Sequence, residues 1–195
     1  DIPKDDKKRM LYETGKKLLF ENGYHEIGMD HFALKTDTLY DAFENGTLHR
    51  NFMGYSSSKT KLMIGLGVSS ISDSWYSFAQ NVKSLEEYYQ LLERNKLPVY
   101  RGHLLTGEDL IIRKHILNLM CQFETSWKNQ EAYFEEIPEV LNQLKEMEND
   151  GLLIIKENSI AVTEKGKPYV RNICMAFDLR LKRKAPEIEL FSMTI

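Results

Sequence analysis

Cysteine is scarce in this chain: the 195 residues include two, Cys121 and Cys174. Each stands among apolar neighbours, which favours buried, reduced thiols and a cytoplasmic location over a disulfide. Neither has a second ligand at the spacing of a zinc site, so the sequence predicts no metal site.

Long apolar runs and an excess of one charge are also lacking. No segment is apolar for long enough to cross a bilayer, and the first residues do not follow the pattern of a signal peptide. The formal net charge is −3 and the isoelectric point is near 6.0, so bulk electrostatics give no reason to expect a nucleic-acid partner. The composition is 42% hydrophobic and 28% charged, which is typical of a globular protein with one or two domains.

The first half of the sequence alternates helical and strand patterns. We expect a helix from Asp5 or Asp6 to about residue 21, and a strand over 24–29. A short helix over 37–43 and a strand over 62–68 follow. The order of helix, strand, helix and strand predicts parallel βαβ units. The buried stripe of the first helix is expected to consist of Met10, Leu11, Leu18 and Leu19.

The second half is predominantly helical. Capping signatures at Ser84 and Thr106 predict helices over 84–94 and from 106 onward. Residues 137–148 form a further amphipathic helix pattern. The apolar face of that pattern consists of Val140, Leu141 and Leu144.

The end of the sequence predicts a small mixed domain. Residues 151–162 contain two short apolar runs around a polar turn, which predicts a β-hairpin. A last helix is expected from Thr163 to about Arg183, with Pro168 in its first turns. We therefore expect a linker or extended arm over 96–106 and a mostly helical, winged-helix-like domain over 107–195.

Several short strings occur together in one known family. In this order they resemble the later half of oxygen-independent coproporphyrinogen III oxidase, a radical-SAM enzyme family of haem biosynthesis. The ordered set spans nearly the whole chain and is more specific than any one string. The strings are GMDHFAL at 28–34, LHRNFMGYSS at 48–57, GLGVSSIS at 65–72, SFAQN at 77–81, YRG at 100–102 and RNICMAFD at 171–178.

The resemblance implies a partial chain. The family holds a [4Fe-4S] cluster through a Cys-x3-Cys-x2-Cys motif, and two widely separated cysteines cannot supply three thiolates. We therefore expect residues 1–95 to be the last part of a radical-SAM (β/α) barrel, with the cluster-binding half upstream. No catalytic residue, metal site or bound cofactor is expected in this chain alone. The open edge of such a barrel remnant predicts non-native self-association.

The resemblance also implies the activity of the complete enzyme. It would convert two propionates of coproporphyrinogen III to vinyl groups, giving protoporphyrinogen IX. S-adenosylmethionine, a [4Fe-4S] cluster and an electron donor would supply the radical chemistry. This chain would contribute cavity wall and lid.

Four residues are candidates for contact with S-adenosylmethionine. The resemblance implies that the loop at Phe52, Met53 and Gly54 lies near a second S-adenosylmethionine and that Ile71 contacts it. Family members often have Gln at the position of Met53, so a side-chain amide contact is not expected here. The alternatives are an aromatic residue that anchors the loop and an isoleucine that belongs to the core.

Asp30, His31 and Tyr55 are candidates for the substrate cavity. Asp30 and His31 follow the expected strand over 24–29, and the resemblance places them in the family's barrel. The structural alternative is an aspartate that caps a turn and a half-buried histidine bonded to the backbone. The basic cluster at 180–184 is expected to be a solvated face, or to dock on the upstream half or attract a carboxylate-rich substrate.

Two other functions stay open. A radical-SAM haem chaperone is a close relative, although GMDHFAL and HRNFMGY favour the oxidase. A winged-helix nucleic-acid-binding module over 107–195 is the other alternative. The acidic composition of residues 137–150 argues against it, because an acidic helix repels phosphates.

Overall fold

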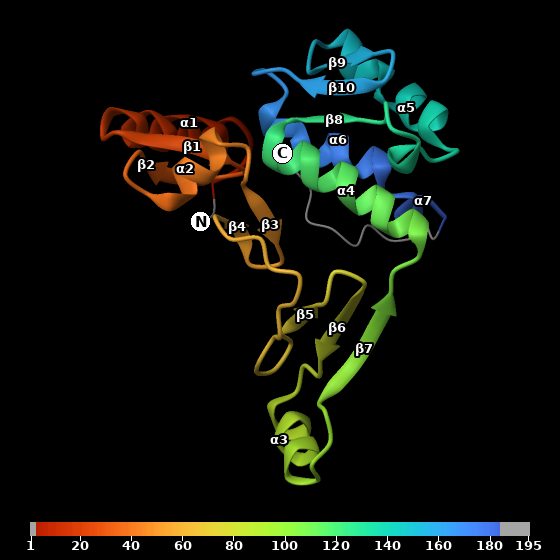
Figure 1. Cartoon of the computed structure of the whole chain (residues 1–195). Helices are drawn as coiled ribbons and strands as arrows, with labels where there is room; N and C mark the ends of the chain where they lie inside the picture. Colours follow the sequence, from red (N-terminus) through yellow and green to blue (C-terminus); the bar gives the residue numbers. More distant parts are fainter. Residues whose placement is uncertain (1–2, 184–195) are drawn as a thin grey trace.

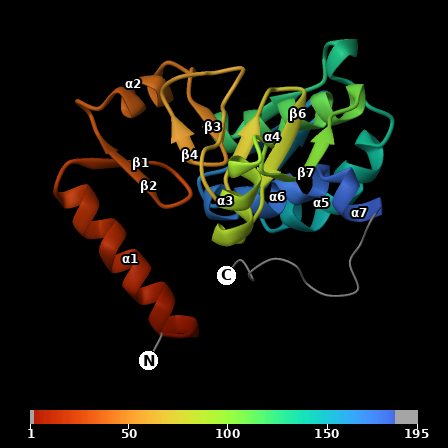
Figure 2. The ribbon, with the colours of Figure 1, turned by 90° about the horizontal axis from the view of Figure 1, so that it is seen from below.

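The computed structural model describes residues 3–183. Two helices and two short hairpins at the start of the chain lie beside a compact body formed by residues 107–183 (Figure 1). A third part, made of three strands and one helix, extends away from that body in the same view. From below, the first helix projects from the rest of the molecule (Figure 2).

The first part contains one helix followed by a β-hairpin. The helix α1 (Asp5–Glu21) begins where expected, although its N-cap is Lys4, without a side-chain cap, and not an aspartate. The strands β1 (Tyr24–Gly28) and β2 (His31–Leu34) pair antiparallel. Met29 and Asp30 connect them with φ angles of 42° and 66°, the left-handed conformation that a two-residue hairpin turn requires.

A second helix and a second hairpin follow. The helix α2 (Thr38–Glu44) is capped by Asp37, which accepts a 2.7 Å hydrogen bond from the N–H of Leu39. The strands β3 (His49–Asn51) and β4 (Gly54–Ser56) also pair antiparallel, with a turn at 52–53.

The predicted parallel βαβ order is wrong. All strand pairs among the described residues are antiparallel, and residues 62–68 form no strand beyond a single bridge from Met63 to Asp73. Gly65 packs so tightly that a Cβ there would lie 2.7 Å from the carbonyl oxygen of Ile71. The glycines of this segment therefore permit a close crossing of two backbones, in place of a regular strand.

The third part is a three-stranded sheet with one helix. The sheet order is β5-β6-β7, and Ser84 caps the helix by accepting a bond from the N–H of Glu87. The segment expected as a linker contains β7, the edge strand that leads into the compact body (Figure 1). The elements are β5 (Ile71–Asp73), β6 (Ser77–Asn81), α3 (Leu85–Glu93) and β7 (Val99–Leu104).

The compact body combines helices with a second three-stranded sheet. The strand order is β8-β10-β9; α4 packs against β8, α5 against β9, and α6 against α4 and α5 (Figure 1). The capping box at Thr106 and the predicted hairpin are confirmed. The elements are α4 (Gly107–Gln122), β8 (Glu124–Ser126), η1 (Gln130–Ala132), α5 (Ile137–Asn149), β9 (Leu153–Lys156), β10 (Ser159–Val162), η2 (Lys167–Tyr169), α6 (Val170–Phe177) and α7 (Leu179–Arg183).

The single last helix that we expected is broken into three pieces. Pro168 lies in the 3-10 turn η2, and Asp178 has a non-helical backbone between α6 and α7. The Asp178 side chain accepts a 2.9 Å hydrogen bond from the N–H of Leu181, so it caps the start of α7 and ends the previous helix.

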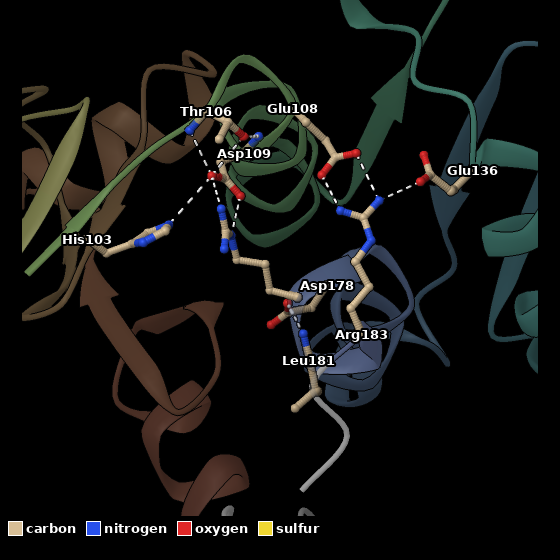
Figure 3. A network of polar contacts seen from close by, with 9 residues as sticks. His103, Thr106, Glu108, Asp109, Glu136, Asp178, Leu181 and Arg183 are labelled. Atoms are coloured by element: carbon tan, nitrogen blue, oxygen red, sulfur yellow. Dashed lines mark hydrogen bonds and ion pairs between the residues drawn. The ribbon is translucent and has the colours of Figure 1, made fainter.

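The basic cluster at 180–184 is largely engaged in ion pairs (Figure 3). Arg180 pairs with Asp109 at 2.6 Å, and Arg183 reaches both Glu108 and Glu136. These contacts hold α7 against the start of α4, while the two arginine side chains remain 41% and 51% exposed, so both are paired on a solvated face as expected. Lys184 lies outside the described residues.

The apolar core is concentrated in the compact body. Twenty of the twenty-five buried apolar residues of the described chain lie between Ile112 and Leu179. Nineteen of the twenty-two exposed large apolar residues lie at or before Leu104. Three of the four residues in the expected stripe of α1 are exposed, namely Met10, Leu11 and Leu18. Most of the stripe is therefore uncovered by residues 3–183, whereas Leu19 is partly buried. No described helix is long and apolar enough to span a membrane.

Candidate functional site

The two hairpins bring His31, Gly54 and Tyr55 together. The Nδ1 atom of His31 donates to the carbonyl of Met29 at 2.9 Å, which is the backbone-bonded arrangement considered as the structural alternative. A Cβ on Gly54, whose φ is 126°, would lie 2.9 Å from the Nε2 atom of His31. The close approach of hairpin and ring therefore requires glycine at position 54.

Tyr55 connects this cluster to the compact body. Its ring meets the His31 ring edge-on at a centroid distance of 5.1 Å, and its hydroxyl donates to the carbonyl of Met120 in α4 at 2.8 Å. The guanidinium of Arg50 lies 4.5 Å from the Tyr55 ring centroid. Burial raises the pKa of the Tyr55 phenol, so it stays protonated and acts as a donor.

Asp30 is not part of the cluster around Tyr55. It lies in the exposed turn of the first hairpin, and its carboxylate interacts with the hydroxyl of Tyr12 in α1. Burial raises the pKa of the Tyr12 hydroxyl, and the negative charges of Glu26 and Asp30 raise it further. Asp30 and His31 are adjacent in sequence, but the Asp30 side chain interacts with Tyr12 of α1, whereas the His31 ring contacts the second hairpin.

The candidates at 52–53 form the tip of the second hairpin. Met53 is 86% exposed, and its N–H is held by the side chain of Asn51 at 2.8 Å. The Phe52 ring meets the Phe78 ring of β6 edge-on, with the centroids 5.1 Å apart. The tip therefore presents one free thioether and one ring that rests on the third part of the chain.

Ile71, the last candidate, begins β5 in the sheet that Phe52 touches. It pairs with Gln80 of β6 and is partly buried. The crossing at Gly65 lies against its backbone, and the N–H of Gly65 donates to the Ser72 side chain at 3.0 Å. The candidates for cofactor contact thus lie on two elements joined by the Phe52–Phe78 contact.

A buried ion pair next to these elements was not predicted from the sequence. Arg113 of α4 binds both carboxylate oxygens of Asp73, at 3.0 Å and 2.5 Å, and the carbonyl of Trp75 at 2.9 Å. His49 is buried near both charges. Burial is the main cause that lowers its pKa, and the positive charges of Lys59 and Arg113 lower it further. No local pattern marks this pair, because its members are far apart in the sequence.

A cavity of about 240 Å³ lies on another side of the first hairpin. It is lined by side chains from α1, β1 and α2, and by Phe123, Glu164 and Lys167 of the compact body. None of the seven candidate residues lines it. Its Lys167 is already paired with Glu164 at 2.6 Å.

Comparison with known proteins identifies the relatives of this arrangement. No protein-family model matches the chain. Over its whole length it is 38% identical to the oxygen-independent coproporphyrinogen III oxidase of Escherichia coli K12 and 36% identical to that of Synechocystis. The solved structure of the Escherichia coli coproporphyrinogen III oxidase, described as a radical SAM enzyme, matches with a TM-score of 0.86 over 93% of this chain. The chain is homologous to oxygen-independent coproporphyrinogen III oxidases.

The match covers only part of these oxidases. The chain spans 44% of the length of the Escherichia coli oxidase, 43% of the Synechocystis one and 43% of the solved chain. This share is consistent with the expectation that the sequence corresponds to one part of a longer oxidase.

The thiols of this chain do not fit the cluster of a radical-SAM oxidase. Burial raises the pKa of Cys121 to about 11 and that of Cys174 to about 12, so both thiols are protonated at neutral pH. Within residues 3–183 there is no group of three or more His, Cys, Asp or Glu side chains that could hold a metal ion. Neither thiol is therefore assigned as a cluster ligand.

Proposed function

We propose that this chain is the C-terminal part of an oxygen-independent coproporphyrinogen III oxidase. The complete enzyme would oxidatively decarboxylate two propionates of coproporphyrinogen III to vinyl groups, with S-adenosylmethionine and an electron donor. The observation that supports this most directly is the 38% identity over the entire chain, together with a TM-score of 0.86 to a solved oxidase. A cytoplasmic location fits its two free, buried cysteines.

The role we propose for this part is to form and hold one wall of the reaction cavity. A cluster and S-adenosylmethionine, held with residues upstream, would supply the radical when bound. Phe52 and Met53 offer apolar surface at a hairpin tip, and Ile71 would exclude water beside them. The rings of Tyr55 and His31 would border the substrate.

The antiparallel pairing of every strand described before residue 107 does not support a parallel (β/α) barrel remnant over 1–95. We propose a winged-helix-like fold for the compact body, with 107–195 as its full extent, because α4, β8, α5, β9 and β10 follow in this order and β8 pairs with β10. We infer no nucleic-acid role for it. Its helix α5 has Glu139, Glu146 and Glu148 against the single basic residue Lys145, which opposes binding to phosphates.

The test is an anaerobic assay of the full-length protein. With coproporphyrinogen III, S-adenosylmethionine and a chemical reductant, we expect protoporphyrinogen IX, with two carbon dioxide molecules released for each product molecule. Tight haem binding without turnover would instead favour a radical-SAM haem chaperone and contradict the proposal. Residues 1–195 alone should give no product under the same conditions.

A further inference from the structure

We propose that Arg113 is a positioning residue that ties both cofactor-contact segments to helix α4. This inference rests on the proposed function, because it concerns Ile71 and the hairpin tip at Phe52. It gives the compact body a specific role, since its helix α4 would set the geometry of the cavity wall in addition to covering it.

The contact between Arg113 and Asp73 is a buried, two-pronged ion pair. The Nη1 and Nη2 atoms each bind one oxygen of the carboxylate, and Nη1 also binds the carbonyl of Trp75 at 2.9 Å. The two side chains are only 13% and 9% exposed. A planar guanidinium in this geometry fixes both distance and orientation, which a flexible surface pair does not.

Asp73 transmits this restraint to Ile71. It is the last residue of β5, a strand of three residues that begins with Ile71. Asp73 also accepts from the N–H of Trp75 at 2.8 Å, and its own N–H binds Met63. A short strand clamped at Asp73 cannot shift without moving Ile71.

The same guanidinium also reaches the other segment. Its Cζ atom lies 4.4 Å from the ring centroid of Trp75 and 5.1 Å from that of Phe78. Phe78 in turn carries the Phe52 ring of the hairpin tip. Arg113 therefore contacts β5 through its ion pair with Asp73. It supports the hairpin tip indirectly, through the Phe78 ring on which Phe52 packs.

The third part has little else to hold it against the compact body. Among residues 57–106, all of them described, Val82 and Pro98 are the buried apolar side chains. A second polar contact joins His103 of β7 to Asp109 at 3.5 Å (Figure 3), but it lies on the far edge strand from β5. Arg113 is thus the contact that acts on β5 directly.

The first test compares amide hydrogen exchange in residues 1–195. Arg113→Lys keeps the positive charge but cannot make the two-pronged contact with the carboxylate. Asp73→Asn keeps the shape of the side chain but removes its negative charge. We expect both to speed exchange in residues 71–81 at least tenfold, with no change in α4 and α6. The matched control, Arg183→Lys, breaks a two-pronged pair with Glu108 inside the compact body and should leave 71–81 unchanged.

Unchanged exchange at 71–81 in either Arg113→Lys or Asp73→Asn, whichever folds, would overturn the coupling. Equal acceleration in Arg183→Lys would overturn it too, because the effect would then be general loosening. Far-UV circular dichroism of each variant verifies that it is folded; because the two variants remove opposite partners, either one that folds decides the outcome.

The second test uses the full-length oxidase and the KM for S-adenosylmethionine. We expect Arg113→Lys and Ile71→Ala each to raise this KM at least fivefold, and the double variant to raise it no further than the larger single effect. A rise for Ile71→Ala with none for Arg113→Lys overturns the positioning role. No rise for Ile71→Ala, with faster exchange in Arg113→Lys, means that the proposed cofactor wall is wrong while the coupling stands.

Discussion

The Tyr55 hydroxyl donates its hydrogen to the main-chain carbonyl of Met120 across 2.8 Å. Met120 lies in the last turn of α4, where carbonyl groups have no partner within the helix. One side chain from the second hairpin therefore completes the end of a helix in the compact body. Because the hydroxyl is occupied, the role proposed for Tyr55 would fall to its ring.

Tyr55→Phe should lower the free energy of unfolding by about 1 kcal/mol, since it removes this hydrogen bond and leaves a carbonyl unpaired. Urea denaturation monitored by circular dichroism measures the difference. Tyr100→Phe is the matched control, because Tyr100 is largely exposed on β7. An equal loss in both variants would show that the Met120 contact is not the cause.

Gly54→Ala should destabilise the fold by roughly 1–3 kcal/mol, because its φ of 126° strains any other residue and the new methyl group meets His31. The His31 ring resonances should shift in the NMR spectrum. Gly15→Ala, in the middle of α1 with no atom within 4 Å of the new Cβ, should instead stabilise by about 0.5–1 kcal/mol. Equal effects at both sites would contradict the close packing at position 54.

The stability of the compact body should fall as the pH drops below about 6.5, the usual pKa of histidine. His115 is buried, and its nitrogens engage Thr125 and Ala132 at 2.7 Å each. Burial is the main cause that lowers its pKa in the folded state, so the unfolded chain binds a proton first and unfolding is favoured in acid.

His115→Phe tests that assignment. It removes the titrating group from a core that already holds Phe134 and Phe177. The free energy of unfolding of the variant should be lower at pH 7, owing to the lost hydrogen bonds, and its dependence on pH between about 7 and 5 should be flatter. Parallel profiles for the two proteins would assign the acid sensitivity to other groups.

Residues 1–195 alone should self-associate, because most of the exposed large apolar side chains lie in the first 104 residues. Sedimentation velocity should show species larger than a monomer whose share grows with concentration. Leu66→Glu and Leu97→Glu, at positions that are 85% and 84% exposed, should reduce that share without lowering the melting temperature. A monodisperse monomer at all concentrations would contradict this expectation.

Local rules predicted the helices before residue 150 and the last hairpin well. The Thr106 capping box, the helix with Val140 and Leu144 on its buried face, and the hairpin around residues 157–158 follow from neighbouring residues alone. The first hairpin was not predicted because Met29 and Asp30 adopt left-handed backbone angles without being glycine.

Long-range contacts were not predicted from the sequence for a different reason. The pairing of Arg113 with Asp73 depends on two elements meeting in space, and nothing near either residue marks it. The apolar stripe of α1 was predicted buried from its periodicity, yet Met10 and Leu18 are exposed because nothing among residues 3–183 covers them. Family resemblance supplied the candidates at 52–54 and 71, which spacing alone would not have selected.

The central claim is that this chain forms a cofactor wall of a radical-SAM oxidase. Its most direct test compares Ile71→Asp with Leu144→Asp in the full-length protein, through melting temperature and 5′-deoxyadenosine yield. We predict that Ile71→Asp keeps the melting temperature and abolishes 5′-deoxyadenosine formation, whereas Leu144→Asp unfolds the protein, because Leu144 is fully buried and an unpaired charge there is costly. Near-normal turnover by Ile71→Asp, or unfolding like that of Leu144→Asp, would contradict the account.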